Sequence, residues 1–229
     1  MARKRPLIPL PRTTPQDITD RLYEHRVPLG LATVAILMVV LAWWGYRTWQ
    51  ARQEGAAQLL LAQALAATET AKAGETPGQP GGAAAGEKAL QLLRQARDGY
   101  PWTAAAEQAL VQIGNVHYQR GEYQAALEAD QTYLEQYPNG AWVLLAGLGK
   151  GYALEGLERY EDAAATFRAF ADRYQGHSLR AEALMGLARS LSQLHKPSEA
   201  VEVYRRVTEE YPGTRWAQQA ERQLISLAP

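Results

Sequence analysis

The longest apolar stretch of the chain lies near its beginning. The sequence from Val27 to Tyr46, VPLGLATVAILMVVLAWWGY, has no charged residue and is bounded by Arg26 and Arg47. About twenty residues of helix rise roughly 30 Å, the thickness of the hydrocarbon core of a bilayer. Tryptophan and tyrosine gather around its far end, as amphipathic rings do at the level of the lipid headgroups. The pattern therefore predicts a transmembrane helix over residues 27–46.

Two other interpretations of this stretch fit less well. A cleaved signal peptide has a shorter apolar region that ends in small residues, whereas this one ends in Trp-Trp-Gly-Tyr-Arg. A buried helix of a soluble core has fewer apolar residues, about 10–14. The residues before the span contain four prolines and form a tail that is too short to be a domain.

The remainder of the chain is helical in pattern and repeats itself. Tyrosines recur at intervals of 37 residues, and the apolar positions between them follow helical spacing rather than strand alternation. Such a period indicates a solenoid or a propeller, and the helical spacing selects the solenoid. Small residues keep the same register, as they must where two helices approach closely. The aligned positions are Tyr100, Tyr137, Tyr174 and Tyr211; Ala89, Ala126, Ala163 and Ala200; Ala109, Ala146, Ala183 and Ala220; and Gly114, Gly151 and Ala188.

Each unit is predicted to be a helical hairpin that ends at its tyrosine. In the first complete unit, helix A covers about residues 104–120, Gly121 makes the turn, and helix B covers about residues 122–136. Proline follows the tyrosine in three of the four units and prevents the helix from continuing. The predicted fold class is all-α: a single transmembrane helix followed by an α-solenoid of helix hairpins.

The stretch LVQIGNVHYQRGEYQAALEADQTYLEQYPNG resembles a tetratricopeptide repeat. The small residue of helix A, the turn glycine, the aromatic after it, the alanine of helix B and the terminal proline of that family fall on Gly114, Gly121, Tyr123, Ala126 and Pro138. The resemblance implies a scaffold that binds other proteins. It is specific for fold and unspecific for function, because the same scaffold serves many partners.

The later units depart from the family pattern near their turns. The second unit has Glu158 and Gln175, and the third has His195 and Pro197. The period of 37 residues, longer than the common 34, resembles the Tyr-Pro repeats of bacterial envelope proteins. With residues 60–101 as a degenerate first unit and residues 214–227 as a capping helix, the resemblance covers roughly three-quarters of the chain.

The patterns divide the chain into six predicted segments. They are a cytoplasmic tail (1–26), a transmembrane helix (27–46), a juxtamembrane helix with the degenerate first repeat helix (47–72), a flexible Gly/Pro loop (73–86), tetratricopeptide-like repeats (87–213) and a capping helix (214–229). The loop, AGETPGQPGGAAAG, is either a plain connection or a hinge that contacts a partner near the membrane. This architecture resembles the ancillary subunit of the bacterial Sec translocon, and its repeats resemble those of the Tol-Pal-associated cell-division coordinator.

Charge adds a direction to this picture. The whole chain has 24 basic and 24 acidic residues, but the segment before the span carries six basic and three acidic residues. The excess of three positive charges predicts that the N-terminus is cytoplasmic and that the repeats are extracytoplasmic. The predicted location is therefore the bacterial inner membrane, with a single pass and a periplasmic repeat domain. A net charge of zero also argues against a nucleic-acid partner.

No motif in the sequence carries catalytic chemistry. The chain has no cysteine, which excludes thiolate metal sites and a lipidated N-terminal cysteine, and its four histidines lie without metal-ligand spacing. His117 is interpreted as a packed residue rather than a ligand. The Gly-rich stretch 147–151 lacks the spacing of a phosphate loop, so its glycines are interpreted as allowing close helix packing. We expect no enzyme activity, no cofactor, no metal and no small-molecule substrate.

A binding groove is predicted from the family resemblance. Because helix A residues line the concave face in tetratricopeptide arrays, the matching columns give a groove with an apolar stripe flanked by polar and aromatic groups. Alternatives are packing of some of these residues beneath the next repeat, or binding through the convex face or the capping helix. The predicted groove residues are Gln108, Val111, Asn115, Tyr118, Leu145, Leu148, Tyr152, Glu155, Met185, Arg189 and Ser192.

The sequence leaves two functions open. The first is a membrane-anchored periplasmic scaffold that assists protein translocation or recruits periplasmic chaperones, with translocon subunits, chaperones or other envelope proteins as partners. The second is a structural coordinator of envelope growth or cell division, related to Tol-Pal or peptidoglycan.

Overall fold

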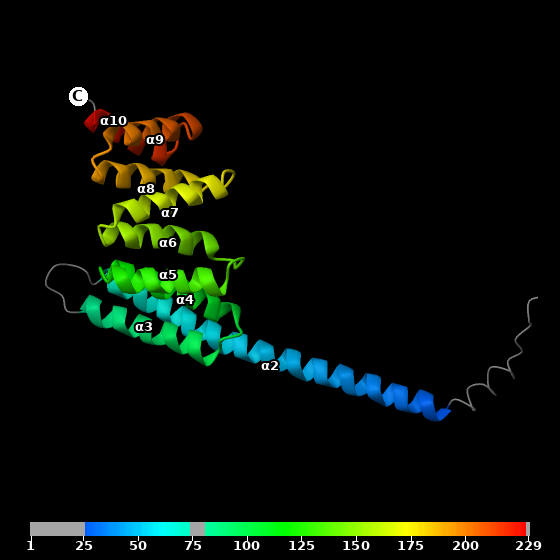
Figure 1. Ribbon diagram of the computed structural model, residues 1–229. Coiled ribbons are helices and arrows are strands. Elements are labelled where there is room, and N and C mark those ends of the chain that lie inside the picture. Colours follow the sequence, from blue (N-terminus) through cyan, green and yellow to red (C-terminus); the bar gives the residue numbers. More distant parts are fainter. Residues whose placement is uncertain (1–25, 74–80, 228–229) are drawn as a thin grey trace, which may run out of the picture. The chain divides into compact units, whose positions relative to one another are not determined.

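The computed structural model describes residues 26–73 and 81–227, which form nine helices and no strand (Figure 1). The chain divides into two units, residues 1–51 and 52–229. Apart from Arg26, the predicted tail lies outside the described residues. The all-α prediction is confirmed.

Helix α2 (Arg26–Ala73) is 48 residues long and contains both the predicted span and the predicted juxtamembrane helix without a break. Its first half is apolar on every side: Leu31 and Val39, for example, are 67% and 69% exposed. Among the described residues it is the one helix long and apolar enough to cross a membrane, with a mean hydropathy of 1.5 in its most apolar window and none of that window buried. Such a helix has no polar side to turn toward water.

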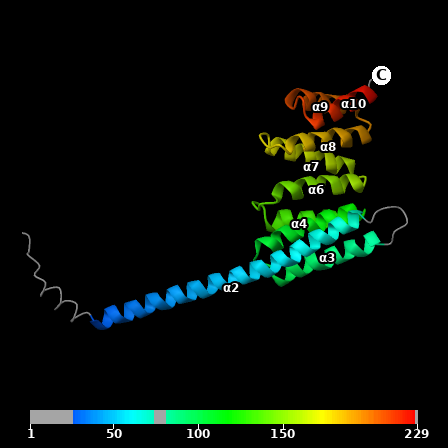
Figure 2. The same cartoon turned by 180° about the vertical axis from the view of Figure 1, so that it is seen from behind.

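The second of these two units, residues 52–229, contains all the repeats, and we call it the repeat unit. It consists of consecutive antiparallel hairpins, visible from both sides in Figures 1 and 2. Three complete hairpins, α4–α5, α6–α7 and α8–α9, follow α3, and α10 closes the end. The bounds are α3 (Gly81–Gly99), α4 (Ala104–Gln119), α5 (Tyr123–Gln136), α6 (Val143–Gly156), α7 (Tyr160–Arg173), α8 (Arg180–Gln193), α9 (Pro197–Glu210) and α10 (Arg215–Ser226).

The predicted loop 73–86 is shorter than expected, because α2 continues to Ala73 and α3 begins at Gly81. Residues 74–80 lie outside the described residues. Three consecutive alanines favour a helix at the start of α3. The Cα of Gly86 also faces the side chain of Arg120, where an added Cβ would lie 3.4 Å from its Nη1 atom. Packing against residues distant in sequence thus holds in a helix glycines that the Gly-rich composition of this segment had predicted to be part of a loop.

The A helices form the inner layer of the solenoid. Consecutive A helices contact one another, α4 with α6, α6 with α8 and α8 with α10, whereas the B helices α5, α7 and α9 contact only A helices. Among these helices, neighbouring A helices therefore lie closer together than neighbouring B helices. The array curves accordingly, with the A helices on its concave side.

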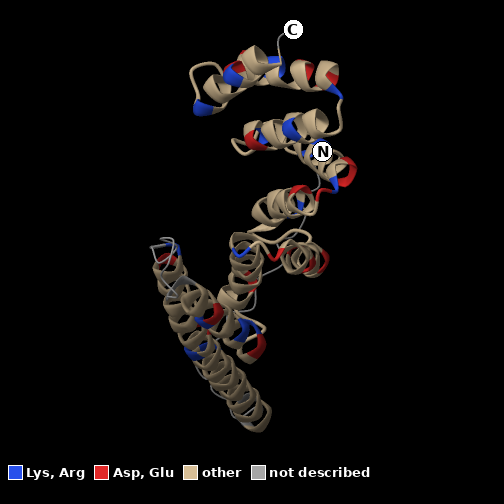
Figure 3. Ribbon diagram, turned by 90° about the vertical axis from the view of Figure 1, so that its left-hand side faces the viewer, with Lys and Arg blue, Asp and Glu red and all other residues tan. Residues whose placement is uncertain are grey.

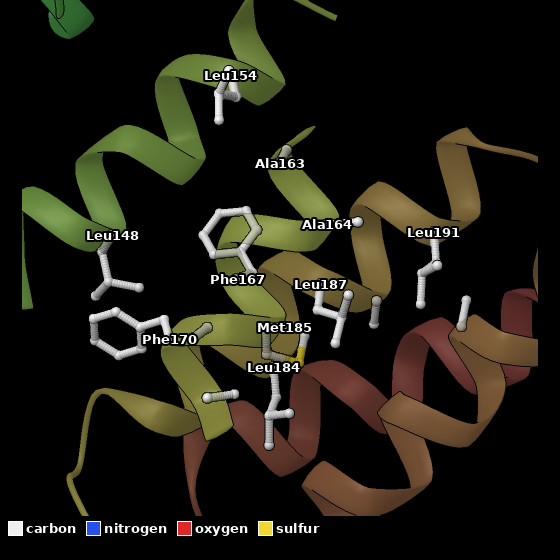
Figure 4. Packing of buried hydrophobic residues seen from close by; sticks show 14 of the residues in the cluster. Leu148, Leu154, Ala163, Ala164, Phe167, Phe170, Leu184, Met185, Leu187 and Leu191 are labelled. Atoms are coloured by element: carbon white, nitrogen blue, oxygen red, sulfur yellow. The ribbon is translucent and has the colours of Figure 1, made fainter. Parts of the chain in front are cut away.

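In the middle of the array, one side chain of the B helix fills the joint between two A helices. The ring of Phe167 on α7 is fully buried in the core cluster (Figure 4), and it lies against Gly151 of its own A helix and Gly186 of the next. A Cβ added at Gly151 would come within 2.5 Å of the ring, and one at Gly186 within 2.7 Å. Both positions must therefore lack a side chain if the ring is to fit. We call this arrangement the glycine joint.

The same joint recurs one unit earlier with a different side chain. Asp130 stands 37 residues before Phe167, and its carboxyl group lies against Gly114 of α4 and Gly149 of α6. A Cβ added at Gly149 would come within 2.4 Å of the Oδ2 atom. The glycines of α6 thus serve helix packing, as the sequence suggested.

The turns between helices A and B share one conformation. Gly121 has a φ of 73°, and the residues at the same position of the next two units, Glu158 and His195, have φ values of 59° and 56°. In each turn the following amide donates to the carbonyl five residues back, over 2.9–3.0 Å, which closes a Schellman cap. The departures at Glu158 and His195 therefore keep the family's turn, at the cost of placing side chains in the left-handed region.

Replacing Glu158 by glycine should stabilise the protein by about 1 kcal/mol, because glycine adopts a positive φ without a steric penalty. The measurement is urea unfolding of the full chain in detergent micelles, followed by circular dichroism. Glu158→Ala is the matched control: it removes the same carboxylate but keeps a Cβ, and should give no comparable gain. Equal stabilisation by both variants would contradict the left-handed strain.

Asp130 is a largely buried acid. It is 3% exposed, and burial is the one influence on the ionisation of its carboxyl group among the described residues, with no charged or hydrogen-bonding group offsetting it. Burial raises the pKa of Asp130 from 3.8 to about 8. The folded protein therefore holds this proton more tightly than the unfolded chain. The resulting stabilisation is complete below about pH 4 and is lost as the pH rises through about 8.

The variant Asp130→Asn should remove this pH dependence. At pH 8 it should be more stable than the parent by on the order of 2 kcal/mol, because no charge has to be buried, and near pH 5 the gain should shrink. Unfolding of the full chain at the two pH values measures the difference. Asp172→Asn, at an exposed position of α7, is the control and should change stability little at either pH. An equal effect of Asp130→Asn at both pH values would refute the assignment.

Candidate protein-binding face

The concave layer of A helices holds the predicted groove residues, but its apolar stripe is not on the surface. Val111, Leu148 and Met185 are only 1%, 3% and 2% exposed. Val111 packs in a cluster with Tyr133 and Ala146, and the other two belong to the large core of the later repeats. The prediction that these three residues line an accessible groove is therefore corrected. Their positions face the neighbouring helices, as the alternative of packing beneath the next repeat requires.

The other predicted residues are reachable from solvent. Tyr118 and Leu145 are each 40% exposed, and Asn115 is exposed. The remainder are half-buried: Gln108, Tyr152, Glu155, Arg189 and Ser192. We call the accessible set on α4, α6 and α8 the A-helix face.

Tyrosine rings connect the first two repeats across this face. The centroid of the Tyr118 ring lies 5.4 Å from that of Tyr123 and 6.2 Å from that of Tyr152. The Tyr152 ring in turn meets Phe167 edge-on, with 5.4 Å between centroids. Tilted and edge-on ring pairs at these distances are favourable. The surface tyrosines are thus continuous with the buried ring of the glycine joint, which holds them in place.

Polar links tie the next pair of repeats together. The hydroxyl of Tyr152 donates to Glu182 Oε1 over 2.7 Å, from α6 to α8. In the opposite direction, Arg189 of α8 donates from Nε and Nη2 to the carboxylate of Glu155, and Ser190 Oγ donates to the same group over 2.9 Å. Two cross-links between consecutive A helices therefore lie on the A-helix face.

These links fix the charge states of the face. Burial and then the hydrogen bond to Glu182 raise the pKa of Tyr152 above its ordinary value, so its hydroxyl stays a donor. Burial opposes the charge of Arg189, but the hydrogen bonds and charge of Glu155 outweigh it and raise the pKa of Arg189. The guanidinium carbon also lies 5.7 Å from the centroid of the Tyr152 ring. The side chain of Arg189 remains 42% exposed, so part of this cation can be reached by a partner.

The sequence analysis missed Glu182 and Ser190. Glu182 follows Gln108 and Leu145 at the same interval of 37 residues, so the repeat register alone could have identified it. Ser190 has no equivalent among the predicted columns. Its role depends on the side-chain direction of Glu155, which sequence spacing does not give.

Other polar clusters in the repeats support the scaffold. His117 is buried, and its Nδ1 atom lies 2.6 Å from Glu122 Oε2; the bond to His117 lowers the pKa of Glu122. Tyr133 donates to Glu107 over 2.5 Å and accepts from the amide of Trp142 over 2.9 Å, which fixes the start of α6. Within residues 26–73 and 81–227, no three His, Asp or Glu side chains gather as metal ligands would.

The comparisons with known proteins bear on the repeats. A family model described as tetratricopeptide repeat matches residues 86–141 and 148–214, more than half of the chain. No curated protein matches the chain. Among solved structures, the MamA RS-1 ArsTM double mutant is similar, with 16% identity, a TM-score of 0.48, and coverage of 72% of this chain and 94% of that one.

Proposed function

Because the chain belongs to the tetratricopeptide repeat family, we propose that it is a membrane-anchored scaffold whose A-helix face holds a segment of another protein. The observation that carries this proposal is the row of linked side chains on that face. Tyr118, Tyr152 and Arg189 come from three successive A helices and are positioned by contacts between repeats. Tyrosine and arginine are the residues on which binding energy concentrates at protein interfaces.

The chemistry of the face suits an extended peptide or a partner helix. Exposed Tyr118 and Leu145 offer ring and aliphatic surface for apolar side chains. Asn115 and the free part of the Arg189 guanidinium offer hydrogen bonds to a peptide backbone or a carboxylate. Because acidic and basic residues are interspersed along the repeats (Figure 3), the described surface favours no single charge in its partner.

The apolar first half of α2 supports a membrane anchor. Its length, its composition and its exposure suit a single pass through a bilayer. The basic excess before the span supports a cytoplasmic N-terminus and an extracytoplasmic repeat unit. In a bacterial inner membrane this arrangement would place the repeats in the periplasm, beside newly translocated proteins. The proposed role is to assist translocation or to recruit periplasmic chaperones.

A role as a structural coordinator of envelope growth or division is the second candidate. The Tyr-Pro repeats with a period of 37 residues favour it, through their resemblance to the Tol-Pal-associated coordinator. The two candidates share the scaffold and the A-helix face and differ in the partner. For either role the tetratricopeptide fold is typically non-catalytic.

Photocrosslinking tests the face and the partner together. A photoreactive amino acid at Tyr118 of the full-length protein should capture proteins in intact cells, because this side chain is exposed beside the linked tyrosines. The same amino acid at Glu161, exposed on the B helix α7, is the control and should capture few of them. Mass spectrometry identifies the products.

Translocon subunits or periplasmic folding factors among the captured proteins would favour the first role, and division or peptidoglycan proteins the second. Capture at Glu161 with none at Tyr118 would contradict the A-helix face as the binding surface.

The orientation has its own test. An alkaline phosphatase fused after Pro229 should be active, because that enzyme needs an oxidising compartment to form its disulfides. A green fluorescent protein at the same position, exported through the same pathway, should stay dark. Fluorescence without phosphatase activity would show that the proposed topology is reversed.

A further inference from the structure

Trp102 is the most exposed large apolar side chain of the described residues, at 84%. It lies in the Tyr-Pro turn that joins α3 to α4. The rings of Tyr118, Tyr152 and Phe167 contact other aromatic rings, whereas the Trp102 ring contacts no aromatic ring or cation within residues 26–73 and 81–227. An indole left fully in water loses the benefit of burying its large apolar surface.

The repeat shows that this turn does not need a tryptophan. At intervals of 37 residues the same position holds Asn139, Gly176 and Gly213, which are small or polar. The last turn of the array has the same hydrogen bonds as the first. Thr103 donates to Tyr100 over 2.7 Å and caps α4 by accepting from Ala106, as Thr214 donates to Tyr211 over 2.7 Å and accepts from Ala217. Since Gly213 serves there, Trp102 has no role in the turn itself.

The turn that carries Trp102 is tied to the end of the repeat unit where α2 enters it. The carboxylate of Glu54 accepts from the amides of Ala104 and Ala105, over 2.9 and 3.2 Å. Glu54 follows Trp49 by only five positions, so the Cα atoms of these two residues lie within about 18 Å of each other whatever the local conformation. Trp49 is the last of the aromatic residues around the end of the apolar stretch. The next Tyr-Pro turn is tied in the same way, since the amide of Ala141 donates to Glu107, but that bond leads to α4 and not to α2.

We propose that Trp102 is a second membrane contact, whose indole inserts into the headgroup region of the same bilayer that α2 crosses. Tryptophan is enriched in that region because its ring is apolar and its N–H can still meet water or lipid oxygens. The contact would hold the first repeat against the membrane surface and restrain how the A-helix face is presented. This inference rests on the proposed anchor.

Lipid photocrosslinking tests the contact. The full-length protein carries an aromatic photoreactive residue, benzoylphenylalanine, at position 102, 49 or 139, and is reconstituted in vesicles of phosphatidylcholine and phosphatidylglycerol. Position 102 should give about tenfold more lipid-modified peptide by mass spectrometry than position 139, because Asn139 occupies the equivalent turn without a tie to α2.

Position 49 separates the two proposals. Lipid adducts at 49 and 102 but not at 139 would support the membrane contact. Adducts at 49 with only the background of 139 at 102 would overturn it and leave the anchor standing. The absence of adducts at 49 would overturn the anchor and the contact with it. Capture of a protein rather than lipid at 102 in intact cells would assign Trp102 to a protein partner and also overturn the proposal.

Benzoylphenylalanine is itself aromatic and could bring position 102 to the membrane. A second measurement therefore keeps Trp102 in place. The chain has no cysteine, so Gly99→Cys, where an added side chain meets open space, gives a single site for the fluorophore NBD. Its emission should shift to shorter wavelength when the full chain enters vesicles, and Trp102→Ser should abolish the shift. A shift that survives Trp102→Ser would show that the indole does not make the contact.

Discussion

The repeat unit depends on how closely its A helices can approach one another. A fully buried ring, Phe167, reaches both its own A helix and the next one because Gly151 and Gly186 present no side chain to it. Any larger residue at these glycines would overlap a ring that is enclosed on all sides and cannot move away. The cost of glycine within a helix, about 1 kcal/mol each relative to alanine, is thus offset by the packing of a buried aromatic side chain.

The A-helix face is a consequence of this spacing. Only when consecutive A helices are in contact can Tyr152 reach Glu182, and Arg189 reach Glu155, across the boundary between repeats. These bonds fix side chains that a partner would otherwise have to order on binding, which lowers the entropic cost of association. The face and the core are therefore linked through Tyr152. Its ring packs on Phe167, and its hydroxyl group donates a hydrogen bond to Glu182 of the next repeat.

The sequence predicted the helices, the turns and the period because these depend on local rules. Tyr-Pro stops, small-residue columns and the register of 37 residues identify hairpins without any knowledge of their partners. The exposure of particular A-helix positions could not be predicted in the same way. Val111, Leu148 and Met185 belong to a helical column that is apolar and reads equally well as a groove or as a core. The direction of the Glu155 carboxylate and the helical start of α3 likewise depend on contacts with residues distant in sequence.

The two joint side chains, Asp130 and Phe167, stand 37 residues apart, and this repetition has a consequence for the whole array. Each of these joints is filled by one residue and involves only the hairpins on either side of it. The angle and spacing between two repeats are therefore determined by residues of those two repeats. A unit that is duplicated or lost brings or removes its own filler and leaves the other joints unchanged. The array is modular in this sense: its length can change by whole repeats without a new solution to the packing of its core.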